Sequence, residues 1–274
     1  MKNITIYLLL ALACLGLQSC LFQEENYFDD SSANRATADV NRCGELLKAA
    51  PNGWVMEYYI GKDYSLGGIT LLCRFDGQRV TMASQMAEAD ETVSSLYSVK
   101  SEQATMLSFD TYNYLVHYFG QPQGSMSDDP NGTLGGDYEF IISSASDERI
   151  ELKGKKYGNR IVMKALTEDQ TWKQYLTKIK KVEDDAFFYE YDLLMDGLYT
   201  GQMIRSNYTF IVTYYDEIGK VHQKTVPFMF TADGLRFHEP VTIDGQTMQN
   251  FVWKNEVISF VCTDEGATEV KMKG

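Results

Sequence analysis

The chain has 274 residues, of which 44% are apolar and 13% aromatic. This composition excludes a disordered chain, and the length is enough for one large domain or two small ones with cores of their own. Acidic residues outnumber basic ones by 38 to 25, for a net charge of −13, so we exclude nucleic acid and bare anionic lipid as partners of the surface.

The first residues predict a secretory signal. Lys2 supplies a positive start, and residues 4–17 form an apolar run too short to span a bilayer. The run ends in Leu17-Gln18-Ser19-Cys20, which resembles the bacterial lipobox. We therefore expect a signal peptide over residues 1–19 and lipidation of Cys20, which holds a protein on a membrane without a spanning helix. The alternatives are an ordinary cleaved signal with a free cysteine, and lipidation of Cys14 after an apolar run of about ten residues.

The segment after Cys20 is polar and acidic. Glu24 and Glu25 form an acidic cluster close to the lipidated cysteine, and this resembles the surface-export signal of Bacteroidota lipoproteins. The resemblance implies the outer face of the outer membrane, whereas the alternative is a generic acidic tether. Because Asn, Asp, Ser and Ala dominate the rest, we predict a flexible, lipidated tether over residues 20–37.

A helix followed by many short strands is predicted for residues 38–166. Val40, Cys43 and Leu47 recur at helical spacing within residues 34–50, and Pro51 ends that pattern. Alternation of apolar residues then begins at Trp54, and an Asp-Gly pair at residues 76–77 indicates a hairpin. Strands are predicted at residues 54–60, 69–75, 79–82, 96–99, 106–110, 112–119, 138–143, 149–153 and 161–163.

A linker helix over residues 167–184 precedes a C-terminal β domain over residues 185–274. Thr167 and Gln170 match a capping box, and Trp172, Leu176 and Ile179 belong to an apolar stripe with lysines opposite. Tight turns divide the remaining chain, including an Asp-Gly pair at residues 233–234 that repeats the earlier one and leaves a duplication open. Strands are predicted at residues 187–194, 208–214, 226–230, 235–237, 248–253 and 257–262.

These patterns together predict the fold class. Short strands joined by tight turns favour antiparallel pairing over βαβ units. We expect a mainly all-β protein, sandwich-like or barrel-like, with two β domains joined by an amphipathic helix and a short helix at the N-terminal side.

Several motifs in fixed order resemble one family. They are Asn52-Gly53-Trp54, Tyr58-Tyr59, residues 107–113, 117–119, 135–140, 152–155 and 158–159. Together they resemble a family of uncharacterised Bacteroidota lipoproteins with a domain of unknown function, associated with SusC/SusD-type outer-membrane import systems. The resemblance implies a surface location and a nutrient-uptake setting. It implies no catalytic residue.

No motif of hydrolytic or metal chemistry stands out. His117, His222 and His238 have no partner at the spacing of zinc hydrolases. Asp137 and Glu139 fall on one face of a strand, where a catalytic carboxylate pair is the weaker interpretation and a surface role the stronger. The loop over residues 128–137 is rich in oxygen ligands but lacks the spacing of a helix-loop-helix calcium site, so a solvated loop is favoured over calcium.

Aromatic and cysteine side chains have structural interpretations as well. Trp54, Trp172 and Trp253 offer flat faces for sugars, but their positions on strand interiors and on the helix stripe favour core packing. After lipidation of Cys20, three cysteines remain in apolar surroundings, and we expect buried free thiols. They are Cys43, Cys73 and Cys262.

The sequence therefore predicts a binding role with no assigned chemistry. We expect a surface lipoprotein that serves as an accessory or ligand-binding component of a nutrient-uptake system, with a small-molecule, glycan or peptide ligand. We predict no cofactor, no metal site and no catalytic residue. Two alternatives stay open, a hydrolase acting on glycan or peptide and a structural or adhesive surface module, and an exposed apolar patch without a deep pocket would indicate the latter.

Overall fold

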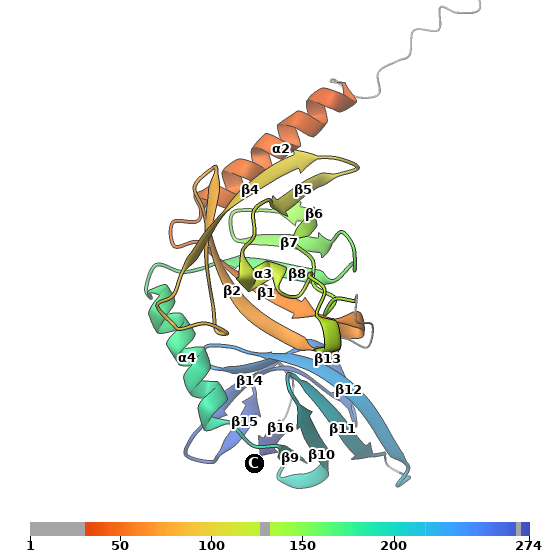
Figure 1. Ribbon diagram of the computed structural model, residues 1–274. Coiled ribbons are helices and arrows are strands. Elements are labelled where there is room, and N and C mark those ends of the chain that lie inside the picture. Colours follow the sequence, from red (N-terminus) through yellow and green to blue (C-terminus); the bar gives the residue numbers. More distant parts are fainter. Residues whose placement is uncertain (1–30, 127–131, 217, 267–269) are drawn as a thin grey trace, which may run out of the picture.

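The computed structural model contains two closed antiparallel barrels of eight strands each, arranged one beyond the other along the molecule (Figure 1). It describes residues 31–126, 132–216, 218–266 and 270–274. The predicted fold class is confirmed, because the chain is mainly β and its sheets are antiparallel and barrel-like. The predicted signal peptide, Cys20 and most of the predicted tether lie outside the described residues.

The first barrel is a meander in which each strand pairs with the next along the chain. Pairing of β1 with β8, which sets Trp54 opposite Ala165, closes it. Closure leaves no sheet edge exposed, so every strand has two neighbours. Its strands are β1 (Trp54–Ile60), β2 (Gly67–Phe75), β3 (Arg79–Ser84), β4 (Val93–Ser101), β5 (Thr105–Phe109), β6 (Glu139–Ala145), β7 (Arg149–Gly154) and β8 (Arg160–Ala165).

The second barrel repeats this topology at the C-terminal side. Pairing of β16 with β9, which sets Met272 opposite Leu193, closes it. The Asp-Gly pairs at residues 76–77 and 233–234 join β2 to β3 and β12 to β13, so these two turns do not fall at equivalent places in the two barrels. Its strands are β9 (Glu190–Met195), β10 (Leu198–Ser206), β11 (Thr209–Tyr215), β12 (Val221–Phe230), β13 (Gly234–Ile243), β14 (Gln246–Lys254), β15 (Ser259–Cys262) and β16 (Val270–Lys273).

Strand β1 is buried on both faces, which explains its unbroken run of apolar and aromatic residues. Trp54 and Tyr58 point into the core of the first barrel, whereas Val55 packs in the core cluster of the second. Strand β2 behaves in the same way, with Leu71 facing one core and Leu72 the other. The outer face of β1 and β2 is therefore covered by the second barrel.

A glycine permits the close approach of the two barrels. Gly67, at the start of β2, has φ of +69°, and a Cβ built on it would lie 2.2 Å from the carbonyl oxygen of Tyr208. Tyr208 precedes β11 in the second barrel and packs against both core clusters. Since β2 and β12 also lie against each other, the barrels share a packed interface.

Two longer helices accompany the barrels. Helix α2 (Ser32–Ala49) lies against β4 and β5 of the first barrel, capped at its start by the Ser31 hydroxyl, and its last turn accepts a hydrogen bond from Trp54. Helix α4 (Trp172–Asp185) runs along the side of the molecule from the first barrel to the second (Figure 1). It buries Leu176, Ile179 and Val182 in the second core, which confirms the predicted apolar stripe. No helix among the described residues has both the length and the apolarity that crossing a membrane requires.

Two local predictions are wrong. The predicted strand over residues 112–119 is instead the short helix α3 (Tyr114–His117), because the Asn113 side chain accepts a hydrogen bond from the Leu115 amide and caps a helical turn. The predicted capping box at Thr167 and Gln170 lies four residues too early. The actual one is formed by Thr171 and Gln174, each side chain bonding the backbone of the other.

Candidate functional site

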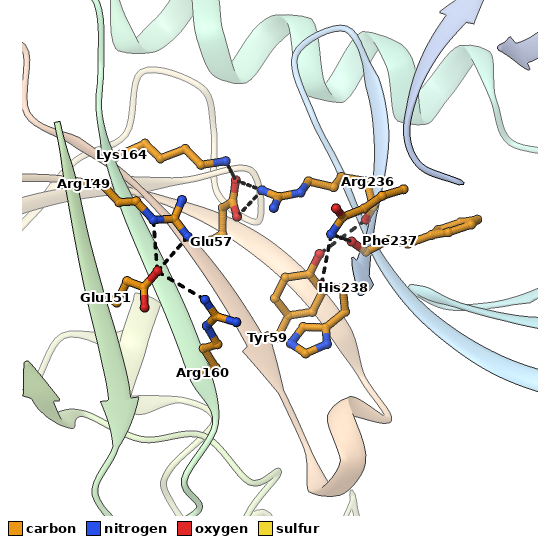
Figure 2. A network of polar contacts seen from close by, with 10 residues as sticks. Glu57, Tyr59, Arg149, Glu151, Arg160, Lys164, Arg236, Phe237 and His238 are labelled. Atoms are coloured by element: carbon orange, nitrogen blue, oxygen red, sulfur yellow. Dashed lines mark hydrogen bonds and ion pairs between the residues drawn. The ribbon is translucent and has the colours of Figure 1, made fainter. Parts of the chain in front are cut away.

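The candidate site is a cavity of about 260 Å³ between the two barrels. Strands β1, β7 and β8 line it from the first barrel, and β13 and β14 line it from the second. Three arginines contribute to the wall, Arg149, Arg160 and Arg236. Figure 2 shows these side chains converging from both barrels with the carboxylates that pair with them.

An irregularity in β13 lies at the cavity, on the side of the second barrel. The register of β13 against β14 shifts between Arg236 and Val241. Pro240 lies within this stretch and has no N–H to contribute to the ladder. Such a shift re-aims the side chains of a strand, and in this strand Arg236 and His238 both line the cavity.

Glu57 joins the barrels through a buried carboxylate. Its side chain is 11% exposed, and both of its oxygens lie 2.7 Å from Nη1 of Arg236 in the second barrel. Lys164, on the neighbouring strand β8, donates to the same carboxylate. Because a buried charge requires paired and hydrogen-bonded partners, this arrangement fixes the Arg236 side chain relative to β1.

A second carboxylate holds the arginines of the first barrel. Glu151 Oε1 accepts from Nε and Nη2 of Arg149, both at 3.1 Å, and from Nη2 of Arg160 at 3.2 Å. Hydrogen bonds from Arg149, followed by those from Arg160, hold the pKa of Glu151 below its ordinary value. Glu151 therefore stays ionised and keeps the two guanidinium groups side by side at the cavity.

Aromatic rings surround His238 at one end of the cavity. The His238 ring centroid lies 3.8 Å from that of Tyr64 and 4.5 Å from that of Tyr59. Burial lowers the pKa of His238, so at neutral pH the ring is uncharged. The Tyr59 hydroxyl donates to the backbone oxygen of Arg236 at 3.3 Å, and burial raises the pKa of Tyr59, which keeps it a donor.

The charges at the site do not cancel. Four cations, Arg149, Arg160, Lys164 and Arg236, are paired with only two carboxylates, those of Glu57 and Glu151. The chain as a whole carries a net charge of −13, so this positive spot lies on an acidic molecule. The arrangement is suited to hold a small ligand by charge and hydrogen bonds.

The predicted histidines lie apart from one another. His117 is in α3, accepts a hydrogen bond from the Asn113 amide and stacks on Tyr138. His222 lies 2.9 Å from an Asp216 oxygen and stacks on Tyr214 in the second barrel. His238 alone faces the cavity, and among the described residues no group of three or more His, Cys, Asp and Glu is placed to hold a metal.

The predicted carboxylate pair has separate structural roles. Asp137 precedes β6, is 3% exposed, and accepts from the backbone amides of Lys156 and Tyr157. Glu139 instead pairs with Lys100 and Lys155 on the outside of the first barrel. Neither lines the interbarrel cavity. Of the predicted calcium loop, residues 128–131 lie outside the described residues.

The tryptophans and cysteines mostly serve the cores, as the sequence indicated. Trp54 is fully buried and Trp253 is 9% exposed, whereas Trp172 is half-buried at the start of α4 with Arg74 over its ring. Cys43 and Cys73 are buried free thiols, and Cys262 is a half-buried one. Lipidation of Cys20 stays a prediction, since that residue is outside the described part of the chain.

No sequence motif pointed to the residues that do form the site. Glu57 and Arg236 are 179 positions apart, and no spacing motif connects them. The only local signal is the alternation of Arg149 and Glu151 on one face of β7, which is common on solvated strands. The cavity exists because two barrels meet there.

Comparison with known proteins identifies a family, and the description of that family assigns no function. A family model described as a domain of unknown function, DUF4302, matches residues 24–255. No curated protein matches the chain. Among solved structures, a DNA polymerase III subunit beta DnaN sliding clamp from Bartonella birtlesii LL-WM9 aligns over 85% of this chain, with 11% identity and a TM-score of 0.13. The chain spans 64% of the length of that protein, and a likeness of this extent carries no argument.

Proposed function

The chain belongs to the DUF4302 family of domains of unknown function. Because this family assigns no role, we propose one from the residues of the chain itself. The proposed role is that of a lipid-anchored binding protein on the outer face of the outer membrane. In this role it is an accessory component of a SusC/SusD-type nutrient-uptake system, and it binds a small ligand between its two barrels. The setting rests on the lipobox-like segment before Cys20 and on the resemblance to Bacteroidota lipoproteins.

The observation that carries the binding role is the interbarrel cavity. Ligand sites occur preferentially where two domains meet, and there they combine an apolar wall with a few convergent polar groups. Here Val162 and the Tyr59 ring supply apolar surface, and three arginines supply the polar groups. The volume of about 260 Å³ is suited to a small ligand.

The pairing of the carboxylates favours binding over hydrolysis. Glu57 and Glu151 each accept hydrogen bonds from two cations. A general base needs a free oxygen within reach of the proton that it removes, and a general acid needs a raised pKa. The pKa of Glu151 is lowered instead. Both carboxylates therefore serve to position arginine side chains.

Thermal-shift screening against sugars, amino acids, short peptides and organic acids tests the binding role. A ligand at one hundred times its Kd stabilises by about 2.7 kcal/mol, which in a protein of this size raises Tm by roughly 5–10 °C. Val162→Trp fills the cavity and abolishes the shift. Val257→Trp makes the same change at a site 52% exposed and keeps it. A shift that survives Val162→Trp, or no shift across the panel, contradicts the role.

Metabolic labelling with an alkynyl fatty acid tests the anchor. We expect the full chain to take up the label and to fractionate with membranes, and Cys20→Ala to lose both properties. Cys14→Ala is the matched control, because Cys14 lies inside the predicted signal peptide and leaves with it. If the label is lost in Cys14→Ala and retained in Cys20→Ala, the lipid is attached to Cys14 and the prediction for Cys20 is wrong.

A further inference from the structure

The charges around the interbarrel cavity call for a negative partner. Two carboxylates hold four cations, which leaves two positive charges at a half-buried site. Glu239 also lines the cavity and, although its side chain is 80% exposed, it reduces this excess to one positive charge, since three carboxylates then face four cations. His238 adds no charge at neutral pH.

Several guanidinium N–H groups at the cavity have no partner in the described chain. Nε of Arg236 is buried and makes no hydrogen bond to any described residue. Arg149 and Arg160 both use Nη2 on the single oxygen Oε1 of Glu151, and no described residue accepts from Nη1 of either. The buried Nε of Arg236 is costly to leave without a partner, so a ligand oxygen that accepts from it gains affinity. The Nη1 groups of Arg149 and Arg160, on side chains 40% and 62% exposed, can donate to a ligand in place of water.

Arginine forks recognise oxyanions by shape as well as by charge. The planar guanidinium presents parallel N–H groups that match the two oxygens of a carboxylate or the edge of a phosphate or sulfate. Arg149 and Arg160 are already held side by side by Glu151, so little side-chain freedom is lost when an oxyanion binds. The first barrel thus contributes a preorganised pair of donors.

The rest of the cavity suits an uncharged, hydroxyl-bearing remainder of the ligand. Gln249 uses its amide nitrogen on the backbone oxygens of Phe237 and His238, which leaves its amide oxygen to accept. The neutral His238 ring, the Tyr59 ring and Val162 complete a wall without further charge. A second oxyanion on the ligand finds no second arginine pair there.

We propose that the ligand of this cavity is a small organic molecule with a single oxyanion group, held by Arg149, Arg160 and Arg236. This inference rests on the proposed binding role and adds the chemical class of the ligand. The oxyanion is a carboxylate, a sulfate or a phosphate, which share the geometry that the arginines recognise.

Matched pairs of probes test the inference by calorimetry on the mature chain purified in detergent. The pairs are D-glucuronate with D-glucose and N-acetylalanine with its amide, and inorganic phosphate and sulfate form separate arms. We expect the anionic member of a pair to bind at least ten-fold more tightly than the neutral one, with an affinity that falls as salt is added. The inorganic arms distinguish a tetrahedral oxyanion from a planar carboxylate.

Charge-matched variants locate the binding. Arg160→Gln should weaken the anionic probe at least ten-fold, and it should still fold because the Arg160 side chain is 62% exposed. Lys173→Gln removes the same charge from a 64% exposed side chain outside the cavity and should change nothing. Neutral probes that bind as well as anionic ones and are lost in Val162→Trp overturn the oxyanion inference and leave the binding role standing. Failure of every probe and of the wider screen overturns both.

Discussion

At the scale of single residues, Glu57 carries the charge balance of the barrel interface. Replacing it by Gln leaves Lys164 and the mostly buried Arg236 facing each other without their shared carboxylate. Removing one partner of a buried ion pair leaves the other charge buried and unpaired. Because Lys164 is partly exposed, the loss is moderated, and we expect Glu57→Gln to lower the free energy of unfolding by about 2 kcal/mol. Glu151→Gln, whose partners are more exposed, should cost less than about 1 kcal/mol. Urea unfolding measures both, and equal losses contradict the argument.

His238 should make stability depend on pH. Burial lowers the pKa of His238; Glu239 and Glu57 oppose the shift, whereas Arg160 and Arg236 add to it. Above the ordinary histidine pKa of about 6.5, the ring is neutral in both folded and unfolded chains. Below it the unfolded chain takes up the proton first, so stability is lost as pH falls from about 6.5 toward the folded pKa, and then no further. Denaturant melts should show this loss in the parent chain and a smaller one in His238→Gln. The other two histidines are present in both proteins. An equal dependence of stability on pH in the two proteins therefore contradicts the assignment of this loss to His238.

At the scale of elements, the start of α4 depends on one hydroxyl. The Thr171 side chain accepts from the Gln174 backbone amide at 3.2 Å, and the Gln174 side-chain oxygen accepts from the Thr171 backbone amide at 2.8 Å. Loss of such a cap costs about 1 kcal/mol, so Thr171→Ala should destabilise by that amount. Thr167→Ala is the control, because the Thr167 hydroxyl bonds to the exposed Asp169 side chain, and the backbone oxygen that accepts from Asn52 is kept in the variant. Its loss should stay within about 0.5 kcal/mol. If the two variants lose the same free energy of unfolding in chemical denaturation, the capping box predicted from the sequence is the correct one.

The elements that the sequence predicted well are those whose burial pattern is strong. β1 and β2 are predicted because a closed barrel and its neighbour bury both of their faces, and α4 because its stripe meets a core. Residues 112–119 mislead because their aromatics alternate as in a strand, while the Asn113 cap decides the backbone. β10 was missed because few of its side chains are buried, Met203 among them, so its alternation is weak.

At the scale of the whole molecule, the site was beyond prediction because it belongs to neither barrel alone. Tyr59 and Arg236 meet across 177 positions, and Glu57 and Arg236 across 179. These three residues lie on strands that the sequence predicts in whole or in part. Their contacts, however, require the two barrels to pack together, as β2 and β12 do. Periodicity reports which face of a strand is buried but not what covers it. The lipid anchor is the reverse case, since a short local motif predicts it without any fold.

The shared interface should make the two barrels unfold as one unit, and Gly67 is the place to break it. A methyl group there meets the Tyr208 backbone at 2.2 Å, in addition to the strain of a positive φ. Gly197→Ala has a similar φ, +78°, and open space around it, so it isolates the backbone strain of about 1 kcal/mol. We expect Gly67→Ala to lose about 1–3 kcal/mol more than this control through overpacking.

Tryptophan fluorescence can follow each barrel separately in this comparison. Trp54 lies in the core of the first barrel and Trp253 in that of the second, so single-tryptophan variants report one barrel each. In the parent background and in Gly197→Ala the two denaturation curves should coincide, because the cores share packed residues such as Tyr208. In Gly67→Ala they should separate, as the covered face of β1 and β2 loosens from the second barrel. Separate curves in the parent chain mean that the barrels are independent, and the cavity between them then lacks the rigidity that preorganised arginines require.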